Sequence, residues 1–377
     1  MARVNKKNGP SQYILGEYAV GTKCFSVVDT GRKETLGDAT GDRRITVRMY
    51  YPVNPDAVVG RERAIIFSEN KNAAIRKSYH IRKVPDGVNV ADYYEDVPMP
   101  EGRRFPLIMF SMGYNSYVES NTFLLCALAS CGYIIASVGH AYEGVENDYD
   151  DGSFDVFDKR INKLMSKKRF RTIHAQNRIL KNKMSYQEAL DQFEELQDNY
   201  PVYSFIKGRV TEWEKDIEKA LESVKERYGD SIDLSRGIGA SGHSLGGCLA
   251  YYLCRYNKEF SCGINIDGAL LGEYPEKQME KPFCQISCIE NVNVETRSLL
   301  DTVSDTYLVT FEDMKHLGFT DLKFFIPIKL LAGKLDPEEM FRHLVYCHSR
   351  FFDKYLKGED IEFKGIESDK IKYVKIV

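Results

Sequence analysis

Long apolar runs are missing from this chain of 377 residues. No stretch approaches the roughly 20 consecutive apolar residues that a membrane-spanning helix needs. The first ten residues are polar and basic, and no apolar segment of signal-peptide length follows them. These absences argue against a membrane-spanning protein and lead us to expect a cytoplasmic, reducing location.

Paired cysteines and a strong net charge are missing as well. The nine cysteines are scattered and include no C-x-x-C pair, which argues against a zinc site or a disulfide framework. The formal net charge is −3, so the composition gives no reason to expect nucleic acid as a partner. Internal repeats and low-complexity segments are absent too. We therefore expect a single domain over residues 1–377 with no bound metal, and the sequence gives no oligomeric state.

Strand-like segments alternate with helical ones over most of the chain. Continuous apolar runs at 105–111 and 133–138 are typical of strands buried on both faces of a sheet, and 117–131 between them has helical spacing. Such a β-α-β unit predicts parallel strands with a right-handed crossover. Further strands are expected at 45–51, 64–67, 238–241, 262–266, 283–289 and 306–311, and a last amphipathic helix at 336–356. The pattern predicts a doubly wound, mostly parallel α/β sheet.

Residues 150–230 differ in character from the rest of the chain. Apolar residues at helical spacing occur around Phe157 and again around Trp213, with polar and charged sequence between them. We expect a helical insertion, able to act as a lid, whose last helix returns the chain to the sheet. The basic run at 167–171 could face a membrane or a phosphate, although a solvated helix face is the ordinary interpretation.

The clearest chemical motif is Gly242-His243-Ser244-Leu245-Gly246, which has the form G-x-S-x-G. A short strand-like segment precedes it and a helical segment follows. In that context the motif predicts a sharp strand-to-helix turn that presents a serine hydroxyl for nucleophilic attack. The two glycines let the turn close, because a Cβ at either position would crowd the neighbouring element. The alternative is an ordinary glycine-rich turn of an α/β protein.

A serine nucleophile needs a base that takes its proton and an acid that holds the base. In this topology the order along the chain is Ser, then Asp or Glu, then His, each at the C-terminal end of a strand. His316 follows a predicted strand and is the expected base, whereas His343 and His348 lie within the C-terminal helix and are expected to be surface or packing residues. Asp267 and Glu290 end successive strands, and these residues alone leave the acid open between the two.

An oxyanion hole is also expected, because acyl transfer builds negative charge on the carbonyl oxygen. The amide of Leu245, directly after the serine, is one predicted donor. The amide of Tyr114, in the loop after the strand at 105–111, is the other. The remaining candidates for the substrate pocket are Met112, His140, Tyr142, Glu143 and His243. Those at 140, 142 and 143 follow the strand at 133–138 and could instead cap that strand.

Four segments, in this order along the chain, resemble a known family. They read FPLIMFSMG at 105–113, GHSLGG at 242–247, CGINIDG at 262–268 and HLGFTD at 316–321. The set resembles the plasma-type platelet-activating factor acetylhydrolases and their bacterial relatives among the α/β-hydrolases. The likeness covers most of the chain and is weakest at 150–205.

The resemblance implies an α/β-hydrolase fold and assigns roles to residues of this chain. It implies Asp267, not Glu290, as the acid, His316 as the base, and the amides of Tyr114 and Leu245 as the oxyanion hole. Met112 stands where the family usually has a histidine. That departure and the insertion both alter the surroundings of the pocket.

We expect a serine carboxylic-ester hydrolase that forms an acyl-enzyme with short-chain acyl or phospholipid-type esters. Its partner is a small-molecule or lipid ester, and no metal or organic cofactor is required. The sequence allows, but does not predict, peripheral contact with a membrane. Thioesterase, lactonase or peptidase chemistry would use the same triad, and a non-catalytic binding protein on a hydrolase scaffold is the alternative outside enzymes.

Overall fold

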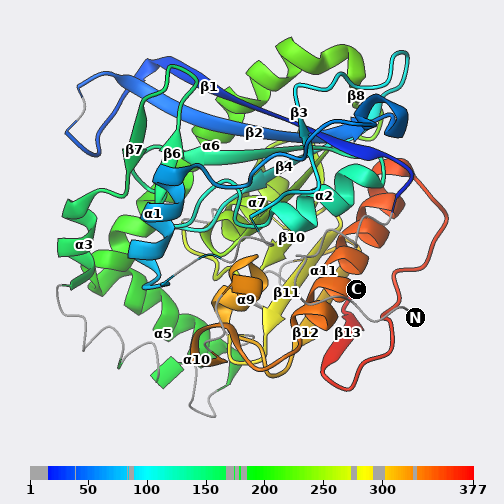
Figure 1. The fold of residues 1–377 in the computed structure, drawn as a ribbon. Coiled ribbons are helices and arrows are strands. Elements are labelled where there is room, and N and C mark those ends of the chain that lie inside the picture. Colours follow the sequence, from blue (N-terminus) through cyan, green and yellow to red (C-terminus); the bar gives the residue numbers. More distant parts are fainter. Residues whose placement is uncertain are drawn as a thin grey trace.

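A computed structural model describes residues 16–377 apart from 39, 83, 85–88, 167–173, 175–177, 180–184, 273–277, 292–301 and 326–328. Within these residues the centre of the molecule is an eleven-stranded sheet (Figure 1). Its strands are β1 (Ala19–Lys33), β2 (Asp42–Val53), β3 (Tyr94–Glu95), β4 (Phe105–Ser111), β5 (Ile134–His140), β8 (Ile232–Asp233), β9 (Ile238–His243), β10 (Phe260–Ile266), β11 (Phe283–Cys288), β12 (Thr306–Phe311) and β13 (Ile371–Lys375).

The strand order is β13-β12-β11-β10-β9-β4-β5-β2-β1-β3, with β8 paired to β4. The six strands from β12 to β5 in this order pair in parallel. Antiparallel pairing joins β5 to β2, β2 to β1 and β12 to β13. The doubly wound, mostly parallel sheet expected from the sequence is therefore confirmed, with antiparallel strands added at both edges.

Helices cover both faces of this sheet, as a mostly parallel sheet requires. Their bounds are α1 (Glu69–Ser78), α2 (Thr122–Ser130), α3 (Lys159–Ser166), α5 (Tyr186–Asn199), α6 (Pro201–Tyr228), α7 (Leu245–Tyr256), α9 (Leu322–Phe325), α10 (Lys329–Ala332) and α11 (Pro337–Phe352). Alternate residues of β4 show which helices lie on which face, because successive strand residues point to opposite sides. Ile108 and Phe110 share a core with α2 and α11, whereas Leu107 and Met109 share a core with α6 and α7. In Figure 1, α2 and α11 lie in front of the sheet.

The described part of the segment from 150 to 230 includes a short strand and several helices. These include β7 (Phe154–Val156), which pairs with β6 (Glu146–Asp148), then α3, α5 and α6. The second half of α6 packs on the sheet with Trp213, Ile217, Leu221 and Val224 fully or almost fully buried, at spacings of three to four residues. The end of this segment is thus part of the core. The basic run at 167–171 lies outside the described residues.

Three expected elements differ from those observed. Residues 64–67 contribute one isolated bridge, between Ile65 and Val90, because Ile65 is 63% exposed and Ser68 caps the helix α1 that follows at once. The helix expected at 117–131 begins at Thr122, since residues 117–121 form turns. The C-terminal helix ends at Phe352 and continues as a π-helical turn to Lys357.

No helix in the described part of the chain combines the length and the apolar character needed to cross a membrane. All nine cysteines are free thiols, and seven of them are buried.

Candidate active site

Ser244 stands at the sharp turn between β9 and α7. Its backbone is left-handed, with φ 57° and ψ −122°, which is strained for a residue with a side chain. The turn closes only with glycine on both sides. A Cβ at Gly246 would lie 2.0 Å from the carbonyl oxygen of Ser111, and one at Gly242 would lie 2.3 Å from the carbonyl carbon of Gly246. The motif therefore forms the strand-to-helix turn that presents the serine hydroxyl.

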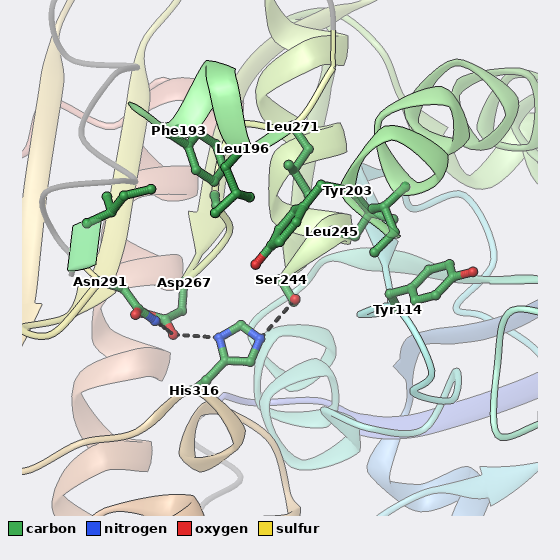
Figure 2. A pocket seen from close by; sticks show the side chains of 13 residues that line it. Tyr114, Phe193, Leu196, Tyr203, Ser244, Leu245, Asp267, Leu271, Asn291 and His316 are labelled. Atoms are coloured by element: carbon green, nitrogen blue, oxygen red, sulfur yellow. Dashed lines mark hydrogen bonds and ion pairs between the residues drawn. The ribbon is translucent and has the colours of Figure 1, made fainter. Parts of the chain in front are cut away.

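His316 lies between Ser244 and Asp267 (Figure 2). Its Nε2 is 2.9 Å from Ser244 Oγ, and its Nδ1 is 2.7 Å from Asp267 Oδ2. A neutral imidazole carries one N–H, so donation from Nδ1 to the carboxylate leaves Nε2 free to accept the serine proton. His316 begins a short 3₁₀ helix (His316–Phe319) beyond β12, and Asp267 follows β10 directly.

The Asp267 carboxylate is fully buried and is held from several sides. The Cys288 amide donates to Oδ1 at 2.7 Å, and Asn291 Nδ2 donates to Oδ2 at 2.9 Å. Burial would raise the pKa of Asp267, but the hydrogen bonds and the charge of His316 outweigh it and hold this pKa below its ordinary value. Glu290, the other residue considered as the acid, is exposed and forms an ion pair with Lys315.

His243 packs against His316 and does not line the cavity. Its ring lies 4.6 Å from that of His316, centroid to centroid, and its Nε2 donates to the His316 carbonyl oxygen at 3.0 Å. Burial, and then the nearby His316, lower the pKa of His243 to about 3. This ring is therefore neutral near pH 7, and its contact supports the main chain of His316.

The residues expected to form the oxyanion hole, Tyr114 and Leu245, both line the cavity beside Ser244. Leu245 is the first residue of α7, so its N–H has no partner within the helix. The loop of Tyr114 is held by the Asn115 amide, which donates to the Glu143 carbonyl oxygen at 2.8 Å. A Cβ at Gly113 would lie 3.2 Å from the Ser244 Cβ, so this loop passes directly beside the serine.

A cavity of about 320 Å³ opens over Ser244 and His316. One wall comes from the insertion, and Figure 2 shows Phe193, Leu196 and Tyr203 facing Ser244 across the cavity. The described lining is Tyr114, Ile179, Phe193, Leu196, Tyr203, Ile206, Ser244, Leu245, Asp267, Ala269, Leu271, Asn291 and His316. Apart from Asp267 and His316, these side chains are uncharged, and most are aliphatic or aromatic.

The other pocket candidates, Met112, His140, Tyr142 and Glu143, do not line this cavity. Met112 is fully buried behind it. Tyr142 turns away with a left-handed backbone, φ 62°, and a Cβ at Gly37 would lie 2.2 Å from its ring. His140 and Glu143 do lie at the end of β5, at the same edge of the sheet as Ser244, but their side chains bond to residues of helix α6 and not to the cavity.

His140 and Glu143 belong to a buried polar network with α6. His140 Nδ1 donates to Asp216 at 2.8 Å, its Nε2 accepts from Ser111 Oγ at 3.0 Å, and its ring stacks on Trp213 with centroids 3.7 Å apart. Burial lowers the pKa of His140, so the ring is neutral. Glu143 accepts two hydrogen bonds from Arg209, at 2.9 and 2.7 Å. The main chain of Glu143 also accepts from the Asn115 amide, so this network supports the loop of Tyr114.

Trp213 also contacts the loop directly. The Tyr114 ring stacks on it with centroids 6.0 Å apart and meets Phe157 edge-on at 5.6 Å. Sequence reasoning found Trp213 only as a core residue of a helix. The five insertion residues on the cavity wall and Asn291 were missed, because neither periodicity nor a motif marks them.

His343 and His348 are buried in α11, away from the cavity, as expected for packing residues. His343 contacts the Tyr373 hydroxyl, and His348 contacts Ser241 Oγ at 3.1 Å. Among the described residues, no three His, Cys, Asp or Glu side chains are grouped as ligands of a metal ion would be.

Residues 4–369 match the family model of platelet-activating factor acetylhydrolase, isoform II. The platelet-activating factor acetylhydrolase of Cavia porcellus is 22% identical over 286 residues, which are 71% of this chain and 61% of that protein. The enzyme of the same name from Canis lupus familiaris is 26% identical over 179 residues, 46% of this chain and 37% of that protein. The chain thus spans less than two thirds of the length of these relatives.

The solved structure of a ferulic acid esterase from Streptomyces cinnamoneus is similar in fold. It superposes with a TM-score of 0.70 at 20% identity and covers 96% of this chain and 98% of its own. Together with the family match, this confirms the α/β-hydrolase fold.

Proposed function

We propose that this chain, which belongs to the family of platelet-activating factor acetylhydrolase, isoform II, is a serine carboxylic-ester hydrolase. The observation that carries the proposal is the single imidazole of His316, which contacts Ser244 Oγ through one nitrogen and Asp267 through the other at the floor of a cavity. A hydroxyl, a base and a buried acid in this arrangement are what nucleophilic acyl transfer requires.

In the proposed reaction Ser244 Oγ attacks the ester carbonyl while His316 Nε2 takes its proton. The amides of Tyr114 and Leu245 donate to the oxyanion that forms. The tetrahedral intermediate collapses to an acyl-enzyme, and His316 delivers the proton to the departing alkoxide. Water then attacks the acyl group, with His316 again as the base, and releases the acid and free Ser244. Asp267 stabilises the imidazolium in both halves of the reaction.

The proposed substrates are short-chain acyl or phospholipid-type esters. The lining of the cavity supports an apolar acyl group, since the described wall opposite the triad is aliphatic and aromatic. The family match and the names of the curated relatives support acetyl-like esters. The insertion at 150–230 serves as a cover for the cavity, because Ile179, Phe193, Leu196, Tyr203 and Ile206 all come from it.

Substitution of the nucleophile tests the proposal. Ser244→Ala is expected to lower the turnover of p-nitrophenyl acetate and butyrate to background, a loss of at least about 10⁴-fold, and to abolish labelling by a fluorophosphonate probe. Ser235→Ala, at an exposed serine, is the matched control and should label and turn over like the parent chain. Undiminished turnover or labelling of Ser244→Ala would refute the proposal.

A further inference from the structure

Asp267 has a polar neighbour on the cavity wall besides His316. Asn291 follows β11 and comes directly after Glu290, which pairs with Lys315 at the surface. The Asn291 amide instead turns towards the triad, and its Nδ2 donates to Asp267 Oδ2 at 2.9 Å (Figure 2). This is the same oxygen that accepts the hydrogen bond of His316 Nδ1.

The hydrogen bonds to Asp267 fix the plane of its carboxylate independently of the imidazole. Oδ1 is held by a main-chain amide, that of Cys288 at 2.7 Å. Oδ2 accepts from Asn291 Nδ2 at 2.9 Å and has a longer contact, 3.6 Å, with the Cys288 thiol. A carboxylate with only one oxygen fixed could rotate about its Cβ–Cγ bond when the imidazole moves during proton transfer. The hydrogen bond from Asn291, the shorter of the two side-chain contacts besides His316 at Oδ2, restricts that rotation and keeps Oδ2 directed at Nδ1.

We propose that Asn291 is a positioning residue of the active site, whose side-chain amide holds the Asp267 carboxylate in the orientation that receives His316 Nδ1–H. This inference rests on the proposed function, because the orientation matters only if His316 acts as the base for Ser244. Asn291 acts through Asp267 and carries no proton itself. Asn291 is the residue directly after Glu290, the alternative candidate for the acid. It thus supports Asp267, which follows the neighbouring strand β10.

The surroundings of His316 determine how a new charge at position 291 would act. Among the described residues, the titratable groups on the elements packed around His316 include Asp267, His243, Glu290, Lys315, Asp321, Lys323 and Lys329. Glu290 and Lys315 neutralise each other at the surface, and Lys323 is bound to the carbonyl oxygens of Ala332 and Gly333. In the part of the chain that the structure describes, a carboxylate at position 291 would therefore lie next to Asp267 with no cation beside it other than the His316 imidazolium.

Two variants and one control test the proposal. Asn291→Leu keeps the size of the side chain but removes the donor, and it is expected to lower kcat by about tenfold while KM stays within about twofold. The loss should be equal for p-nitrophenyl acetate and butyrate. Asn291→Asp is expected to move the acidic limb of the kcat/KM–pH profile upward by about one pH unit, since a second carboxylate favours the imidazolium. Glu290→Gln, one residue away and exposed, should leave kcat within about twofold of wild type.

Several outcomes would overturn the inference. One is a wild-type kcat in Asn291→Leu, and another is a wild-type pH profile in Asn291→Asp. The third is a loss in Asn291→Leu that falls only on KM or on only one of the two esters, because that pattern indicates a direct contact with the substrate. Fluorophosphonate titration counts the folded active sites, so rates are compared per active site. Ser244→Ala is measured in parallel. Retained activity in that variant would defeat the proposed function itself, whereas the outcomes above would defeat only the role of Asn291.

Discussion

Replacement of Asp267 by asparagine is the sharpest test of the triad. The structure fixes the orientation that the new amide must take. The Cys288 N–H donates to Oδ1, so an asparagine would keep its oxygen there and place its NH₂ group against His316 Nδ1. Nδ1 would then have to accept, and the ring proton would move to Nε2, the nitrogen that faces Ser244. A protonated Nε2 cannot take the serine proton.

The expected loss follows from two effects. The imidazolium formed in the reaction would no longer face a carboxylate, and unit charges about 4 Å apart attract by about 4 kcal/mol at an effective dielectric constant of about 20. That alone corresponds to about 10³-fold in rate. The wrong tautomer adds to it, so we expect kcat of Asp267→Asn to fall by about 10³–10⁴-fold, with KM little changed.

The assay is steady-state hydrolysis of p-nitrophenyl acetate at pH 7.5, with thermal unfolding as a check on folding. Glu290→Gln is the matched control, because it removes the other strand-end carboxylate, an exposed one whose ion pair contributes at most about 1 kcal/mol to stability. Its kcat should stay within about twofold of wild type. If Asp267→Asn keeps more than about a tenth of the activity, or if Glu290→Gln loses as much as Asp267→Asn, the assignment of the acid is wrong.

Two further predictions concern Trp213 and Asp92. Trp213→Leu is expected to lower kcat by about tenfold because Tyr114 loses its stacking partner, whereas Trp213→Phe should retain most of it; equal rates in the two variants would contradict this role for the ring. Burial, opposed in part by Arg63, raises the pKa of Asp92 to about 6 in the folded protein. As the pH rises, the carboxyl ionises in the unfolded chain at a lower pH than in the folded one, so the free energy of unfolding falls between about pH 4 and about pH 6. Asp92→Asn should therefore gain up to about 3 kcal/mol of unfolding free energy at pH 7.5 and nothing at pH 4 in urea titrations, and a gain of the same size at both pH values would be inconsistent with this explanation.

The central strands could be predicted because burial on both faces leaves a direct trace in the sequence. β4, β10 and β12 are nearly continuous apolar runs, and each was expected within two residues of its observed bounds. The segment at 64–67 has the same composition, and Ile66 and Phe67 are buried, but Ile65 is exposed and the segment pairs through one isolated bridge. Apolar composition alone does not distinguish these two situations.

The positions of the site residues were predictable to the extent that chain order and strand ends determine them. Ser244, Asp267 and His316 each follow a parallel strand, and the sheet brings such ends to one edge. The same rule predicted the correct edge of the sheet for His140 and Glu143 but not the orientation of their side chains. These side chains bond to Asp216 and Arg209, which lie on a helix far along the chain. Asn291 leaves no local signal, since its contact exists only because β10 and β11 are neighbours.

Helix α6 contributes both to the cavity and to the support of the Tyr114 loop, which protein engineering would have to alter separately. Its first two turns supply Tyr203 and Ile206 to the cavity, and its next turns supply Arg209, Trp213 and Asp216 to the polar network behind the Tyr114 loop. The segment at 150–230 is therefore not a module that can be exchanged whole between related proteins. Grafts and libraries that aim to change the acyl preference belong in α5 and in α6 before Arg209, with the rest of the helix left as it is.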